Sequence, residues 1–219
     1  PAAGDAAEAA LPDVLAAADS ALGARSVAVV FDARSHGAAS LVHPALAGAQ
    51  GPALVLWVDH DGPVGTEALV RLLSPGAATV GRGLAGAFSL SDCLFALNRD
   101  TLHVFDPSGA FLDDGGGEKR APGPAGRRYQ LGDGDLMRKF PNQFEPFAHL
   151  PFGVSERGIA AGTILRLPLR GDFFVDGALD RERVDGLLRS FEAGAERALL
   201  FGHALAGVTT HVFSGGNAL

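Results

Sequence analysis

The stretch VGRGLAGAFSLSDCLFALNRDTLHVFDP, residues 80–107, joins a glycine-rich loop to a strand-like run that ends in an aspartate. Its glycines follow the spacing G-x-G-x-x-G: Gly81, Gly83 and Gly86. Asp106 comes about 20 residues later, where a dinucleotide-binding fold carries the acidic residue that holds a ribose. The stretch therefore poses a choice between a dinucleotide site, another phosphate-binding loop and a simple turn.

The residues before Gly81 argue against the dinucleotide fold. In that fold a strand ends at the first glycine, because the pyrophosphate lies between the strand end and the next helix. Here LLSPGAAT, residues 72–79, reads as a helix end followed by a turn, and two strand-like runs already precede it. In a chain with 30 glycines the spacing alone has little weight. An NAD-binding oxidoreductase is therefore kept only as a remote alternative, and a plain glycine-rich turn is favoured over it.

Composition places the chain among globular proteins and narrows its partners. Its 219 residues, 47% hydrophobic and 20% charged, are enough for a sizeable core. The net charge of −7 and the lack of a basic cluster argue against nucleic acid. Cys93 is the single cysteine and the seven histidines form no cluster, so we expect no disulfide and no metal site. Glycines and prolines interrupt the uncharged run at 37–58, so we expect no membrane span.

Hydrophobic patterning predicts alternating helices and strands in a single domain over residues 1–219. The Gly-, Pro- and Asp-rich residues 107–128 are predicted to form a flexible loop. Because the alternation lacks strict βαβ regularity, we predict an α/β fold with a mixed sheet and helices on one face. The predicted strands are 26–32, 52–59, 101–106, 162–169 and 207–213, and the predicted helices are 10–22, 65–74, 85–92, 136–147 and 180–201.

Several segments beyond the glycine loop carry specific patterns, in order along the chain. They are FDARSHGAASLVHPALAGAQGPALVLWVD (31–59), LMRKFPNQFEPF (136–147), GTILRLPLR (162–170) and LLRSFEAGAERALLF (187–201). Together with the strand that ends in FDP, they resemble the sacsin family, which carries QGPAL, FPxQFxPF and GTxFRxPLR segments. The resemblance extends from about residue 11 to residue 213.

The resemblance implies the Bergerat fold, a two-layer α/β sandwich shared by gyrase, heat-shock chaperone, histidine-kinase and mismatch-repair ATPases. In that fold ATP lies between helices and sheet. There a helix supplies a glutamate as general base and an asparagine that binds magnesium. The matching helix, DVLAAADSALGA at 13–24, places Asp13 and Ala17 at those positions, four residues apart on one helical face. The family's other nucleotide positions fall on Asp59 for the adenine amino group, Gly81 and Gly83 for the phosphates, and Thr163 beside the adenine.

The departures from the family pattern fall on the catalytic positions. Ala17 has no oxygen and cannot hold magnesium, which needs oxygen ligands. Asp13 is one methylene shorter than glutamate, and a base misplaced by ~1 Å can cost ~100-fold in rate. Where the family carries a longer basic lid, this chain has only SPGAAT, residues 74–79. The loss of these parts, with the scaffold segments kept, is the pattern of a pseudo-ATPase.

The sequence therefore predicts a degenerate sacsin-like ATPase domain that serves as a structural or protein-interaction module without ATP hydrolysis. It needs no cofactor, or binds ATP or ADP weakly through Asp59, Gly81, Gly83 and Thr163. The alternative is a weak or active ATP-binding, chaperone-type ATPase. Expected partners are other protein chains or further domains of the same chain, and the expected location is intracellular, in the cytoplasm. In this interpretation Gly86 has no ligand, and Asp106 with Pro107 forms a strand-terminating turn.

Overall fold

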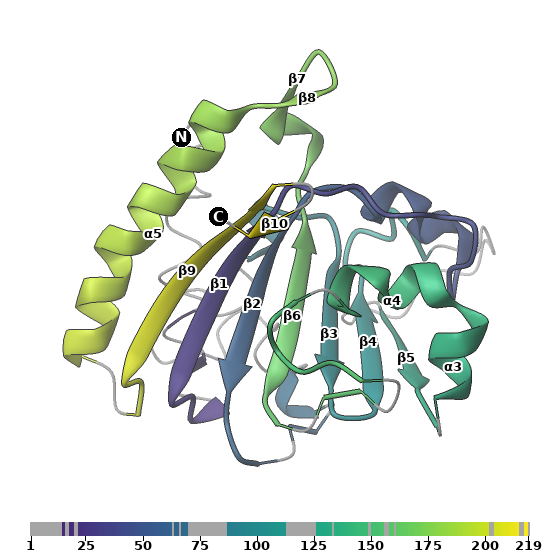
Figure 1. Ribbon diagram of the computed structural model, residues 1–219, viewed down its shortest axis with the longest axis horizontal. Helices are drawn as coiled ribbons and strands as arrows, with labels where there is room; N and C mark the ends of the chain where they lie inside the picture. Colours follow the sequence, from purple (N-terminus) through teal and green to yellow (C-terminus); the bar gives the residue numbers. More distant parts are fainter. Residues whose placement is uncertain are drawn as a thin grey trace.

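An eight-stranded mixed sheet organises the protein in a computed structural model (Figure 1). Its strand order is β10-β9-β1-β2-β6-β3-β4-β5. The strands are β1 (Ser26–Asp32), β2 (Ala53–Asp59), β3 (Leu94–Asn98), β4 (Thr101–Phe105), β5 (Gly126–Gln130), β6 (Thr163–Pro168), β9 (Gly207–Ser214) and β10 (Asn217–Ala218). The structure describes residues 15, 18–19, 22–62, 64–65, 67–69, 87–112, 126–132, 134–148, 150–155, 158–159, 161–201, 204–214 and 217–218.

The sheet is mixed because β1 and β9 run parallel, whereas its other pairs of neighbouring strands are antiparallel. Beside it, a short hairpin joins β7 (Phe174–Val175) to β8 (Ala178–Leu179). The helices are η1 (Pro44–Ala49), α3 (Asp135–Lys139), α4 (Pro141–Ala148), η3 (Gly171–Phe173) and α5 (Arg181–Phe201). The predicted α/β fold with a mixed sheet is confirmed.

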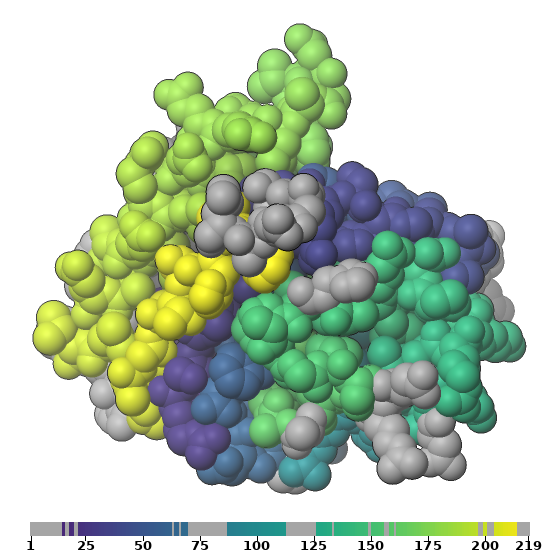
Figure 2. All heavy atoms as spheres, viewed as in Figure 1, coloured from purple at the N-terminus to yellow at the C-terminus, as the bar shows by residue number. Residues whose placement is uncertain are grey.

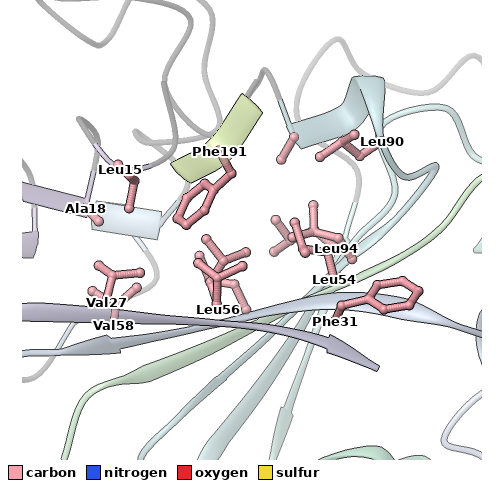
Figure 3. Packing of buried hydrophobic residues seen from close by; sticks show 14 of the residues in the cluster. Leu15, Ala18, Val27, Phe31, Leu54, Leu56, Val58, Leu90, Leu94 and Phe191 are labelled. Atoms are coloured by element: carbon pink, nitrogen blue, oxygen red, sulfur yellow. The ribbon is translucent and has the colours of Figure 1, made fainter. Parts of the chain in front are cut away.

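Strand alternation divides the interior into two cores, one on each face of the sheet. Along β2, Leu54, Leu56 and Val58 face α5, and we call this the α5-side core (Figure 3). Ala53 and Val55 face the opposite way, into the α4-side core. Residues of β2 are buried on both faces, which explains why it reads as a continuous apolar run rather than as an alternating one.

Each core is closed by its own helices. The long helix α5 places Val184, Leu187 and Phe191 on the α5-side core, at the spacing that lines one helical face. On the other face, η1 contributes Leu46, and α4 contributes Phe144 and Phe147. Figure 1 shows α5 beside β9, with α3 and α4 over the opposite half of the sheet. Helices therefore cover both faces of the sheet and not one face, as predicted, because the aromatic segment at 140–147 packs on the face away from α5.

Two segments differ from the sequence prediction. Strand β3 was not predicted, because all five of its residues are buried and the run LFALN shows no alternation. It forms a tight hairpin with β4, in which Arg99 adopts a left-handed backbone with a φ of 48°. Strand β5 begins at Gly126, inside the residues 107–128 that were predicted as a loop. None of the helices in the described residues is long and apolar enough to cross a membrane.

Candidate functional site

The end of the sheet where β2 stops and β6 begins carries two of the predicted nucleotide residues. Thr163 is the first residue of β6 and pairs with Val58 on one side and with Asn98 of β3 on the other. Its side chain is fully buried. Because paired residues share a face, Thr163 points to the α5 side together with Val58. Leu15 and Ala18, from the segment to which the resemblance assigns the base and metal positions, are buried on the same side.

The hydroxyl of Thr163 is already engaged within the protein. His60, directly after β2, places Nε2 2.9 Å from Thr163 Oγ1, and both side chains are buried. Burial lowers the pKa of His60, against the opposing effect of the Gly62 backbone and of the carboxylates of Asp59 and Asp61. A neutral imidazole has one donor and one acceptor nitrogen, and one of the two is taken up by Thr163.

Asn98 completes this buried polar cluster of His60, Asn98 and Thr163. Its Nδ2 donates to the carbonyl oxygen of Val64, which brings the segment after β2 over the end of β3. Asn98 is almost fully buried, and its Oδ1 has no hydrogen-bond partner within the described part of the chain. A buried amide oxygen without a donor costs free energy, so this atom is a free acceptor for a small ligand or a water molecule.

Asp59 lies at the same end of the sheet but in a different environment. Alternation along β2 places it in the series of Val55 and Trp57, on the α4 side, so it and Thr163 point to opposite faces. Its Oδ1 is 3.0 Å from Nη2 of Arg25, whose Nη1 is 2.7 Å from Asp61. The hydrogen bond that Arg25 donates to Asp59 and the charges of both carboxylates raise the pKa of Arg25.

The other predicted site residues, Asp13, Ala17, Gly81 and Gly83, lie outside the described residues. Leu15 and Ala18, two residues before and one residue after Ala17 in the sequence, are described, and both are buried in the α5-side core. Asp19, the residue after Ala18, accepts hydrogen bonds from the backbone N–H groups of Ala204 and Leu205, each at 2.8 Å. Its carboxylate therefore anchors the start of β9.

The remaining specific segments meet on the α4 side, where they have structural roles. Arg166, in the middle of β6, donates to the carbonyl oxygens of Ala49 and Gly51, each at 2.7 Å. It is fully buried, and burial lowers the pKa of its guanidinium to about 10. Its guanidinium also lies 5.9 Å from the ring centroid of Phe95. The GTILRLPLR and QGPAL segments are thereby held together by one side chain.

Asp106 also has a structural role, as the terminating turn predicted for FDP. Its carboxylate is fully buried and accepts hydrogen bonds from three successive backbone N–H groups: those of Ala110, Phe111 and Leu112. The hydroxyl of Ser108 donates to it as well. With its oxygens occupied by the loop that follows β4, Asp106 is not available to hold a ribose, and the dinucleotide interpretation loses its acidic residue.

A polar network joins the FDARSH segment to α4. Asp32, at the end of β1, accepts from Arg34 Nε at 2.7 Å and lies 3.3 Å from Nε2 of His36. Burial acts against its charge, but the hydrogen bonds with His36 and Arg34 hold the pKa of Asp32 below its ordinary value. On α4, Asn142 Oδ1 accepts from both the backbone and the hydroxyl of Ser40.

Sequence reasoning did not assign roles to Arg166, Asp32 or Asn142. Arg166 carried a signal, since a lone arginine inside an apolar strand must find buried acceptors. The partner of Asn142 had no such signal, because Ser40 lies 102 residues away from it in the chain. The partners of Asp32, in contrast, are local: Arg34 and His36 lie two and four residues further along the chain. None of the described residues forms a group of histidine, cysteine or acidic side chains that could hold a metal ion.

Comparison with known families agrees with these shared segments. A model of the family described as the sacsin domain matches residues 76–218. The chain belongs to the sacsin family. No curated protein matches the chain. The sacsin match includes Asp106, the aromatic segment of α4, and Thr163 with Arg166 on β6, whereas Asp59 and the carbonyl partners of Arg166 lie before its first residue.

Proposed function

We propose that this sacsin-family domain is a degenerate Bergerat domain that acts as a structural or protein-interaction module and does not hydrolyse ATP. One observation carries the proposal: the hydroxyl of Thr163, predicted to support adenine, is buried and bonded to His60. Asp59, predicted to accept the adenine amino group, is ion-paired with Arg25 and lies on the other face of the sheet. The replacement of the magnesium-binding asparagine by Ala17 supports the same conclusion.

The chemistry explains why these features remove hydrolysis first. ATP hydrolysis in such a site needs a metal to neutralise the phosphates and a base within reach of the attacking water. An alanine side chain supplies neither a ligand nor a hydrogen bond, and a shortened carboxylate at Asp13 places the base farther away. A scaffold without these parts can still present its surfaces to other protein chains or domains.

Titration calorimetry with ATP, ADP and NADH, each with and without magnesium, tests this proposal together with an assay of phosphate release. We expect no magnesium-dependent heat and no turnover. Magnesium-dependent, micromolar ATP binding with turnover would refute the proposal. Binding of NADH alone would point instead to the dinucleotide alternative.

Restoration gives a sharper test of the degenerate site. The double variant Asp13→Glu with Ala17→Asn returns the family's base and metal ligand to the helix. If only these parts are lost, the variant gains magnesium-dependent ATP binding. If the occupied Thr163 also closes the pocket, affinity returns only when His60→Ala is added. Val175→Lys, at an exposed position on the β7–β8 hairpin, is the matched control. It is expected to change neither the binding of ATP nor the release of phosphate.

Weak nucleotide binding without hydrolysis is the second candidate, and Asn98 favours it. Its buried Oδ1, without a partner among the described residues, offers the acceptor that an adenine amino group requires. In that case ATP and ADP bind with equal affinity and without magnesium. Asn98→Leu and Thr163→Val would each weaken such binding, whereas binding that survives both variants would exclude this cluster as the site.

A further inference from the structure

The outer edge of β9 is unpaired over most of its length. On its inner side β9 is bonded to β1 from Gly207 to Phe213. On its outer side, as far as the chain is described, only Phe213 and Ser214 have partners, in β10. The backbone N–H and C=O groups that point outward from 207–212 are therefore available to another strand.

This edge is open on both faces as well as along its side. Four successive residues of β9 are exposed: Thr209, Thr210, His211 and Val212. Figure 2 shows β9, in yellow, at the surface beside α5. Four exposed residues in a row cannot arise from a strand with one covered face, since alternation would bury every second side chain. The packing of α5 therefore leaves the middle of β9 accessible.

The two edges of the sheet differ in how they are protected. Natural edge strands are shielded against pairing by charged side chains, proline or bulges. The opposite edge, β5, carries Arg127 and Arg128. Strand β9, with the sequence GVTTHVFS, has no Asp, Glu, Lys, Arg or proline and is rich in β-branched residues, which favour sheets. The absence of charge means that two β9 edges brought together meet no like-charge repulsion along the strand.

We propose that β9 pairs with β9 of a second copy of this chain in an antiparallel arrangement, with Thr210 opposite Thr210 on a two-fold axis. Such a contact is isologous, because each copy contributes the same edge, and it therefore closes as a dimer. The sheet becomes continuous across the two copies. This proposal is independent of whether the domain binds a nucleotide.

The register follows from the faces and from β10. Val208, Thr210 and Val212 pair with α5-side residues of β1 and so share that face. If the α5 sides of both copies are to lie on the same face of the joined sheet, each α5-side residue of one copy must lie opposite an α5-side residue of the other. The register centred on Thr210 places Val208 opposite Val212 twice and Thr209 opposite His211 twice. The pairing between the two copies ends at Val212, because the next residue, Phe213, is already paired with β10.

Other registers form fewer favourable cross-strand pairs along the free edge of β9. Centring on Thr209 would pair Val212 with Ala206, which lies before β9, and would lose both valine pairs. Centring on His211 would place Val208 and Thr209 opposite Ser214 and Phe213, whose outer edge β10 already occupies. The register centred on Thr210 therefore uses the free edge fully and pairs β-branched side chains across it, a favourable combination in sheets.

Light scattering coupled to gel filtration tests the proposal on the 219-residue chain. We expect a mass of twice 22.4 kDa that falls toward 22.4 kDa on dilution. Thr210→Lys and Thr210→Glu each place like charges directly opposite one another, and each should shift the protein to monomer. An equal mixture of the two variants should recover the dimer, because Lys then faces Glu. Val175→Lys, at an exposed strand position away from this edge, should remain dimeric.

Cross-linking tests the register itself. In Thr210→Cys the two cysteines face each other across the axis, with the Cα separation of directly paired strand residues, about 4.5–5.5 Å, which suits a disulfide. In Val212→Cys the two copies lie about 13 Å apart, four residues along the strand, and should not cross-link. Cys93 does not interfere, because it is buried and burial raises its pKa to about 12. A monomer at every concentration, or a dimer unaffected by Thr210→Lys, would overturn the proposal.

Discussion

Arg166 of β6 and Ala49 at the end of η1 are joined by a hydrogen bond of 2.7 Å from Nη1 to the carbonyl oxygen, although 117 residues separate them in the chain. A second bond of the same length reaches Gly51. Arginine can serve two acceptors at once because its planar guanidinium presents several donors in fixed directions. This contact fixes the segment that leads into β2 against the middle of the sheet.

Replacing Arg166 by Met is expected to lower the free energy of unfolding by about 2 kcal/mol. The variant leaves two carbonyl oxygens without their donors, and this cost exceeds the gain from removing a buried charge. Urea unfolding followed by circular dichroism measures the difference. The free energy of unfolding of Arg166→Lys should lie between those of the original protein and the Met variant. Lysine keeps the positive charge but lacks the planar guanidinium that serves both carbonyl oxygens. An unchanged midpoint for the Met variant would show that water replaces the guanidinium.

The carboxylate of Asp106 is expected to contribute more to the free energy of unfolding than an exposed acidic side chain such as Asp61 does. Asp106→Ala removes the acceptor of three backbone N–H groups and should cost about 2–3 kcal/mol of stability. Asp61→Ala, which loses only an exposed ion pair with Arg25, should cost less than about 1 kcal/mol. Equal losses in urea unfolding for the two variants would contradict this account of the turn.

His103 is expected to make stability depend on pH between about 6.5 and 4. Burial, with the nearby charge of Arg128, lowers the pKa of this β4 histidine to about 4. Its folded-state pKa is below the unfolded one, so the unfolded chain binds a proton first as the pH falls, and stability is lost across this interval by up to about 3 kcal/mol. Unfolding in urea at several pH values measures the slope. His103→Leu should flatten it, and an unchanged slope would assign the effect to another group.

Asp32 is expected to act in the same direction at lower pH. Because its folded-state pKa lies below the ordinary value, its contribution is complete above about pH 4 and is lost as the pH falls further. Asp32→Asn should therefore destabilise the protein at neutral pH and make little difference in strong acid. The comparison needs the free energy of unfolding of both proteins at each pH. A constant difference at every pH would show that shape, and not charge, matters at this position.

The hydrogen bond between His60 and Thr163 is expected to appear as a coupling energy. Thr163→Val leaves His60 Nε2 buried without its partner and should cost about 1–2 kcal/mol. In a double-mutant cycle with His60→Leu, the two losses should be less than additive by about 1 kcal/mol, since the second change removes a bond that is already broken. Strict additivity would place the two groups in separate networks.

Much of the fold follows from local patterns in the chain. Strands β1, β2 and β6 and the helix α5 were predicted within a residue or two, because each is a long apolar run or carries a clear helical periodicity. The terminating role of Asp106 was also predicted, since an aspartate before proline at a strand end favours a turn. Strand β3 was missed because complete burial removes the alternation by which a strand is recognised.

The order of the strands and the faces to which side chains point required the folded chain. Nothing local in residues 207–214 indicates that β9 lies next to β1, parallel to it, with an open outer edge. Likewise, Asp59 and Thr163 were both predicted from their segments, but the register of β2 against β6 decides that Thr163 faces His60 and that Asp59 turns away toward Arg25. Local sequence records propensity and burial, whereas register depends on pairing between segments that are distant along the chain, and a shift of one residue exchanges the two faces of a strand.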